Sequence, residues 1–159
     1  MPADPAPGQW PVQAEPMHQT QLRPDVIERI MLRRGKASIH DVIDPARTAL
    51  VVIDMQHAFV EPGLPSAVPV AELIVPNINQ LAERFRAANS TVVWVYTTFS
   101  SATLNDWNTF FGGVYDAAFS QAVVDNLSAG APGHQLWSQL DIQPDDLRIT
   151  KDRFSAFLP

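Results

Sequence analysis

The chain has 159 residues, of which 46% are hydrophobic, and it carries 11 Lys and Arg against 17 Asp and Glu. That length suits one domain with a core of its own. The absence of cysteine excludes a disulfide framework and any thiolate ligand or nucleophile within these residues. The net charge of -6 argues against a nucleic-acid-binding surface. Because the apolar runs are too short for a membrane span and the first residues lack a signal-peptide pattern, we expect a cytoplasmic protein that does not bind membranes.

The first part of the chain is rich in proline, with five of the 14 prolines in the first sixteen residues. This composition predicts a flexible arm over residues 1–20. Residues 21–47 are predicted to form a helix and a lead-in. Within them, Pro24 and Asp25 suit the first turn of a helix over residues 23–34, and Gly35 can end it.

Two continuous apolar runs, residues 48–53 and 91–96, are typical of strands covered on both faces. Apolar residues at helical spacing lie between them, which predicts a parallel strand–helix–strand crossover. A further helix over residues 116–127 and a short strand over residues 147–150 complete an α/β fold with a parallel sheet. The segment 97–115 is predicted to be a long loop that shapes a binding site.

Three strands are few for an open α/β sheet, so we expect the domain to be incomplete at its C-terminus. Such a sheet keeps an unpaired edge and an uncovered apolar face, and both favour self-association. We therefore expect a homo-oligomer.

Charged residues follow two of the predicted strands, Asp54 after the first and Lys151 after the third. Ligands of parallel sheets bind beyond the carboxyl ends of the strands. A carboxylate and an ammonium are costly to bury singly but can neutralise each other as a pair. In the alternative interpretation, Asp54 caps the loop after its strand and Lys151 is solvated, and the residues alone leave both interpretations open.

Two segments resemble the isochorismatase-like cysteine hydrolases. Residues 48–59, Thr-Ala-Leu-Val-Val-Ile-Asp-Met-Gln-His-Ala-Phe, are similar to the opening strand and loop of that family, and residues 150–157, Thr-Lys-Asp-Arg-Phe-Ser-Ala-Phe, are similar to its lysine segment. The resemblance implies a three-layer α/β/α fold with a mainly parallel sheet, here over residues 48–159. It also implies a small-molecule substrate with an amide, ureido or vinyl-ether bond that is hydrolysed.

By this resemblance, Asp54 is the acid/base residue and Lys151 the lysine of an Asp–Lys–Cys triad. The family's cysteine follows a further strand, and this chain contains no cysteine. We therefore expect the chain to be inactive as an amidase in this form, although vinyl-ether-hydrolysing relatives use the aspartate without a thiol. The alternative is a non-catalytic module of the same fold that binds a small ligand or a subunit. The candidate substrate-binding residues are Gln56, Phe59, Phe99, Trp107, Phe154, Ser155 and Phe157.

We expect no metal and no other cofactor. Nicotinamidase relatives carry an Asp-x-His metal motif after the second strand, whereas residues 105–108 here are Asn-Asp-Trp-Asn. His57 is predicted to lie on a loop, and we interpret it as a surface or hydrogen-bonded histidine, like His18, His40 and His134. The missing motif favours amide- or ureido-hydrolysing relatives over nicotinamidases.

Overall fold

The computed structural model describes residues 22–39, 42–68 and 70–157. The arm predicted over residues 1–20 lies outside the described residues, as do His18 and His40. The described residues up to Asp44 belong to one compact unit and those from Pro45 onward to another, and each unit is described by itself. No helix in the described part of the chain combines the length and apolar character that a membrane span requires.

The first unit contains the predicted N-terminal helix, α1, which spans Pro24–Arg34. Pro24 occupies its first turn, where a missing N–H costs nothing. Asp25 in the first turn and Arg33 and Arg34 in the last turn complement the helix dipole. Gly35 ends the helix at φ 71°, and its N–H donates to the Met31 carbonyl. The sequence signals for this helix are therefore confirmed at both ends.

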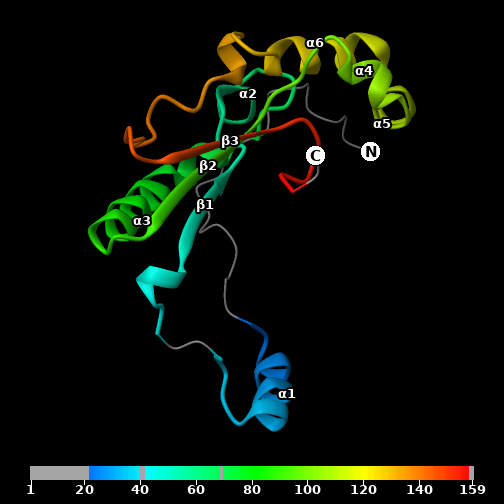
Figure 1. Ribbon diagram of the computed structural model, residues 1–159. Coiled ribbons are helices and arrows are strands. Elements are labelled where there is room, and N and C mark those ends of the chain that lie inside the picture. The colour runs from blue at the N-terminus through cyan, green and yellow to red at the C-terminus, as the bar shows by residue number, and fades with distance from the viewer. Residues whose placement is uncertain (1–21, 40–41, 69, 158–159) are drawn as a thin grey trace. The chain divides into compact units, whose positions relative to one another are not determined.

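The second unit is built on a three-stranded sheet in the order β1-β2-β3 (Figure 1). The strands are β1 (Ala49–Ile53), β2 (Thr91–Thr97) and β3 (Leu147–Lys151), and both pairings are parallel. All three strands were predicted, and β2 and β3 each extend one residue beyond the predicted end. Because the strands run in the same direction, their carboxyl ends meet at one edge of the sheet.

Helix α3 (Val75–Ala87) connects β1 to β2 and covers one face of the sheet (Figure 1). Ala82 of the helix packs in one cluster with Val52 of β1 and Trp94 of β2, and both Ala82 and Trp94 have no exposed surface. The remaining elements are η1 (Pro45–Arg47), α2 (His57–Val60), η2 (Ala71–Ile74), α4 (Thr103–Asp106), α5 (Asn108–Val114), α6 (Ala117–Leu127) and η3 (Pro132–His134).

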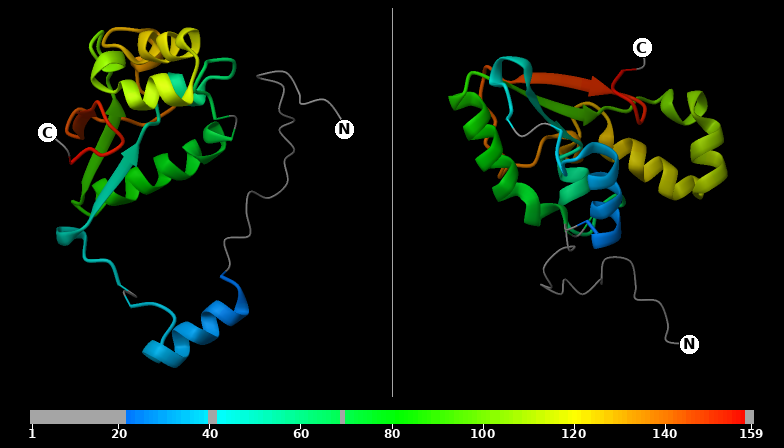
Figure 2. Two further views of the ribbon diagram at one scale, coloured as in Figure 1. Left: turned by 90° about the vertical axis from the view of Figure 1, so that its right-hand side faces the viewer. Right: turned by 90° about the horizontal axis from the view of Figure 1, so that it is seen from below.

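The opposite face of the sheet is apolar and open. Val51, Ile53, Leu147 and Ile149 lie on this face and remain 40–56% exposed. Figure 2 shows α3 along the sheet and α6 beyond its carboxyl end. The predicted α/β fold with a parallel sheet is confirmed. Within the described residues, no helix covers this second face, so only one helical layer lies against the sheet. The predicted uncovered face is also confirmed.

The segment predicted as a long loop after β2 instead forms the short helices α4 and α5. The segment is rich in Asn, Ser and Gly, which are typical of loops, and this composition obscures the helical spacing of its few apolar residues. Most of those residues are aromatic and pack together: Phe111 is buried, and the Trp107 and Phe110 rings stack at 4.7 Å. Mutual packing of the rings, rather than intrinsic helix propensity, therefore supports these helices.

An ionic network fixes the start of β3 against α3. Arg86 of α3 donates to Asp146 at 2.7 Å and to Asp141 at 2.8 Å, and the Trp94 indole donates to Asp146 at 2.8 Å. Burial raises the pKa of Asp146, but the hydrogen bonds from Arg86, Trp94 and the Gln143 amide outweigh it and lower that pKa to about 2. The network holds the turn that precedes β3, and β3 ends at Lys151.

Candidate active site

Asp54 directly follows β1 and is held by the neighbouring strand. Its N–H donates to the Val95 carbonyl of β2 at 2.8 Å. Its backbone is left-handed, with φ 58°, a conformation that is uncommon outside glycine and more accessible to Asp and Asn than to most residues. Backbone conformations of this kind concentrate at functional sites, where the surrounding structure holds them.

The side chains of Asp54, Thr97 and Lys151 form a closed triangle at the carboxyl edge of the sheet. Lys151 Nζ lies 2.9 Å from Asp54 Oδ2 and donates to Thr97 Oγ1 at 2.8 Å. The Thr97 hydroxyl donates to Asp54 Oδ1 at 2.9 Å. The predicted ion pair is therefore confirmed, and the alternative of a solvated lysine is wrong.

The two charges differ in their access to solvent. The Lys151 side chain is 5% exposed, whereas the Asp54 side chain is 29% exposed. A buried ammonium depends on its partner because an unpaired charge in the interior is costly. The ammonium is thus enclosed behind the carboxylate, and the carboxylate is the more accessible member of the pair.

Sequence reasoning did not assign a role to Thr97. It lies at the end of β2 and is the register partner of Lys151 on β3. A hydroxyl can donate one hydrogen bond and accept others, so it can bridge an ammonium and a carboxylate. The signal that could have identified it was the strand register, which brings the last residue of β2 beside the lysine.

Gln56, predicted to face the substrate, instead lies beneath the site and outside the cavity. It has no exposed surface. Its side-chain amide donates to the carbonyls of Thr97 at 2.9 Å and His134 at 2.8 Å, and its oxygen accepts from the Thr97 N–H at 2.7 Å. With three hydrogen bonds made inside the protein, its amide holds the backbone at the end of β2.

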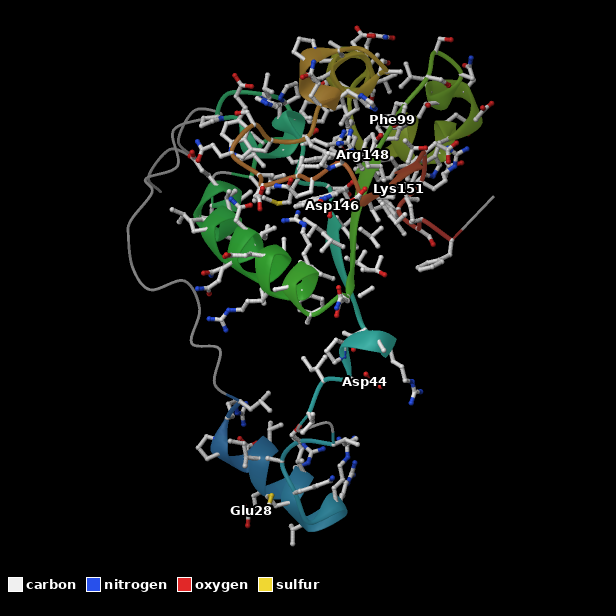
Figure 3. All side chains as sticks on the ribbon, turned by 60° about the vertical axis from the view of Figure 1, so that its left-hand side comes forward. Glu28, Asp44, Phe99, Asp146, Arg148 and Lys151 are labelled. Atoms are coloured by element: carbon white, nitrogen blue, oxygen red, sulfur yellow. The ribbon has the colours of Figure 1, made fainter. Side chains whose placement is uncertain are left out.

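A cavity of about 350 Å³ opens beside the charged triangle. Figure 3 shows Phe99 and Lys151 close to helices α4 and α5. Helices α5 and α6 supply much of the cavity wall. Four of the predicted substrate-binding residues line it, namely Phe59, Phe99, Trp107 and Phe154. Ser155 and Phe157 lie outside this cavity, along the uncovered face of the sheet. The wall also includes Phe110, Phe111, Tyr115, Phe119, Val123 and Leu127. The cavity therefore joins a charged pair to an apolar, aromatic enclosure of the size that small ligands occupy.

The two described histidines lie in hydrogen bonds. His57 begins helix α2 rather than lying on a loop, and its Nδ1 is 3.0 Å from a carboxylate oxygen of Glu61. His134 Nε2 is 2.8 Å from the Thr98 hydroxyl, and burial lowers the pKa of this histidine. Among residues 22–39, 42–68 and 70–157, no group of three His, Cys, Asp or Glu side chains could hold a metal ion.

The fold and the site define an α/β domain with an Asp–Thr–Lys triangle beside an aromatic cavity at the carboxyl edge of a parallel sheet. The family model described as "Isochorismatase domain" matches residues 48–158, and the chain belongs to this family.

Three similar proteins illustrate the relationship. A protein of Arabidopsis thaliana named probable inactive nicotinamidase is 36% identical over 111 residues, which are 69% of this chain and 54% of the relative. The N-carbamoylsarcosine amidase of an Arthrobacter species is 30% identical over 115 residues, 70% of this chain and 40% of the relative. The crystal structure of a cysteine hydrolase from Pseudomonas syringae pv. phaseolicola matches with a TM-score of 0.56 at 25% identity, covering 72% of this chain and 51% of that one. The chain thus spans about half the length of these proteins.

Proposed function

We propose that this chain supplies the carboxylate and the ammonium of a hydrolase-type site for a small molecule with an amide or ureido group. The observation that carries the proposal is the Asp54–Lys151 pair at 2.9 Å, beside an aromatic cavity. One relative is named N-carbamoylsarcosine amidase, which favours a substrate of that kind.

The chemistry of the pair suits acid/base work. Asp54 is partly open to the cavity and can accept a proton from a nucleophile, and Lys151 can stabilise negative charge that develops beside it. Asp54 can then return the proton to the departing nitrogen as the C–N bond breaks. Because the sequence contains no cysteine, it supplies no thiol for the attack. We therefore expect this chain by itself to bind such molecules without hydrolysing their amide bond.

A second candidate function is ligand binding without catalysis. Both carboxylate oxygens of Asp54 already accept hydrogen bonds, one from Thr97 and one from Lys151. A carboxylate that is engaged on both oxygens serves equally well as a fixed part of a binding site. The name of the Arabidopsis relative, probable inactive nicotinamidase, also favours this function. A third candidate function is the hydrolysis of a vinyl ether, in which Asp54 protonates the substrate and no thiol is required.

Titration of the ¹⁵N-labelled chain with N-carbamoylsarcosine and with nicotinamide tests binding. We expect N-carbamoylsarcosine to shift the amide resonances of Thr97 and Lys151 saturably. Asp54→Asn should weaken its binding, whereas Glu83→Gln, an exposed change on α3, should not. Absence of saturable shifts with both compounds would overturn the proposal.

Turnover assays separate the catalytic outcomes. We expect no ammonia release from either amide by the purified chain, and thiol-independent release would contradict the expected inactivity. Hydrolysis of isochorismate that disappears in Asp54→Asn would favour the vinyl-ether chemistry. Binding without any turnover would favour the ligand-binding module.

A further inference from the structure

Arg153 lines the cavity but has no role in the proposed hydrolase chemistry. It follows β3 by two residues and lines the cavity together with Lys151. Its guanidinium carbon lies 5.3 Å from the centre of the Trp107 ring, a cation–π distance. The side chain is 27% exposed and thus lies at the boundary between cavity and solvent.

The charges that line the cavity do not cancel. Asp54, Lys151 and Arg153 are its only charged lining residues within the described part of the chain. The first two neutralise each other at 2.9 Å, so Arg153 leaves one positive charge. An apolar enclosure weakens screening by water, so this charge attracts an anionic group more strongly than a surface arginine does.

The hydrogen-bonding capacity of Arg153 is only partly used. Its Nη1 donates to the Asp152 carbonyl at 2.9 Å and lies 3.2 Å from the Asp152 carboxylate. That carboxylate is 61% exposed and does not line the cavity. Because water screens an exposed ion pair, the Asp152–Arg153 pair contributes little to stability. Among the described residues, Nε and Nη2 of Arg153 have no partner. Guanidinium groups bind carboxylates through two such parallel donors.

We infer that Arg153, placed over the Trp107 ring, selects ligands that carry a carboxylate in addition to the group that faces the Asp54–Lys151 pair. The inference rests on the proposed function and names its ligand class: a small amide or ureido acid with an apolar or aromatic side chain. The aromatic wall receives the apolar part, and the guanidinium pairs with the carboxylate. The contact with the Trp107 ring restricts the position of the guanidinium, and a lysine would not reproduce its planar pair of donors.

Calorimetric titration with a matched pair of ligands tests the inference. The probes are N-carbamoylphenylalanine and its neutral primary amide, which differ only in the carboxylate. We expect the wild-type chain to bind the acid about tenfold more tightly, with the preference falling at higher salt. Arg153→Gln should abolish the preference by weakening the acid alone, and Arg153→Lys should restore only part of it. Arg148→Gln serves as the control because Arg148 is an exposed arginine of β3 outside the cavity.

The outcomes separate this inference from the proposed function. Equal binding of the two probes to the wild-type chain, or a preference that survives Arg153→Gln, overturns the role of Arg153 and leaves the proposed function standing. Failure of both probes to bind the folded wild-type chain counts against both proposals. An equal loss of affinity with Arg148→Gln would show a general charge effect and would also overturn the inference.

Discussion

Thr97 Oγ1 accepts a hydrogen bond from Lys151 Nζ at 2.8 Å, and the same two residues are register partners in the β2–β3 ladder. The contact between their side chains is therefore set by the backbone pairing of two parallel strands. Because the Thr97 hydroxyl also donates to Asp54 at the end of β1, one oxygen links the ends of all three strands. The geometry of the ion pair is thus a property of the sheet.

Removal of this oxygen should weaken the site. Thr97→Val keeps the shape of the side chain but leaves the buried ammonium with one partner fewer, so we expect a loss of about 1–2 kcal/mol in the free energy of unfolding. Ligand affinity should fall as well, because the carboxylate loses the donor that orients it. Thr97→Ser retains the hydroxyl and should keep most of both properties. Urea denaturation with parallel ligand titration measures them, and equal behaviour of the Val and Ser variants would show that the hydroxyl has no role.

The two members of the ion pair should differ in the cost of their removal. Asp54→Asn strands an ammonium that is 5% exposed, whereas Lys151→Met strands a carboxylate that is 29% exposed. We therefore expect Asp54→Asn to cost about 2–3 kcal/mol and Lys151→Met about 1 kcal/mol. Asparagine tolerates the left-handed backbone at this position, so strain does not obscure the comparison.

A double-mutant cycle completes this experiment. The variant with both substitutions should lose less stability than the sum of the single variants, because neither charge is then left unpaired. Additive losses in chemical denaturation would mean that the 2.9 Å contact carries no coupling energy.

The sequence was most informative where one physical rule decides the outcome. The unbroken apolar runs predicted β1 and β2, and the shared edge of parallel strands predicted that Asp54 and Lys151 would meet. Gln56 shows the limit: the family resemblance made it a candidate for the cavity, but its side-chain amide makes three hydrogen bonds to the backbone of Thr97 and His134. These hydrogen bonds join segments that are distant in the sequence, and the periodicity of apolar residues does not reveal such contacts. The same holds for α4 and α5, whose packing depends on ring contacts.

Gln56 should therefore be more important for stability than for ligand contact. Gln56→Leu removes three hydrogen bonds and leaves the Thr97 N–H, the Thr97 carbonyl and the His134 carbonyl without this partner, so we expect a loss of about 3 kcal/mol or more. Gln135→Leu, at an exposed position, is the control and should change stability by less than about 0.5 kcal/mol. Denaturation measures the stability, and hydrogen exchange at the Thr97 amide should accelerate in the Gln56 variant alone. Slow exchange there despite the substitution would refute the role as a backbone support.

The Asp146 network predicts a specific dependence of stability on pH. The pKa of Asp146 is lowered from 3.8 to about 2 in the folded chain, so folding favours the ionised form. The resulting stabilisation is fully present above about pH 4 and is lost as the pH falls through about 2. The shift corresponds to about 2 kcal/mol at neutral pH.

We expect the difference in unfolding free energy between the wild-type chain and Asp146→Asn to shrink toward zero between pH 4 and pH 2. The neighbouring Asp145→Asn, an exposed change, should show no such trend. A difference between wild type and Asp146→Asn that stays constant in urea titrations over this range would contradict the assignment of the acid-sensitive stability to Asp146.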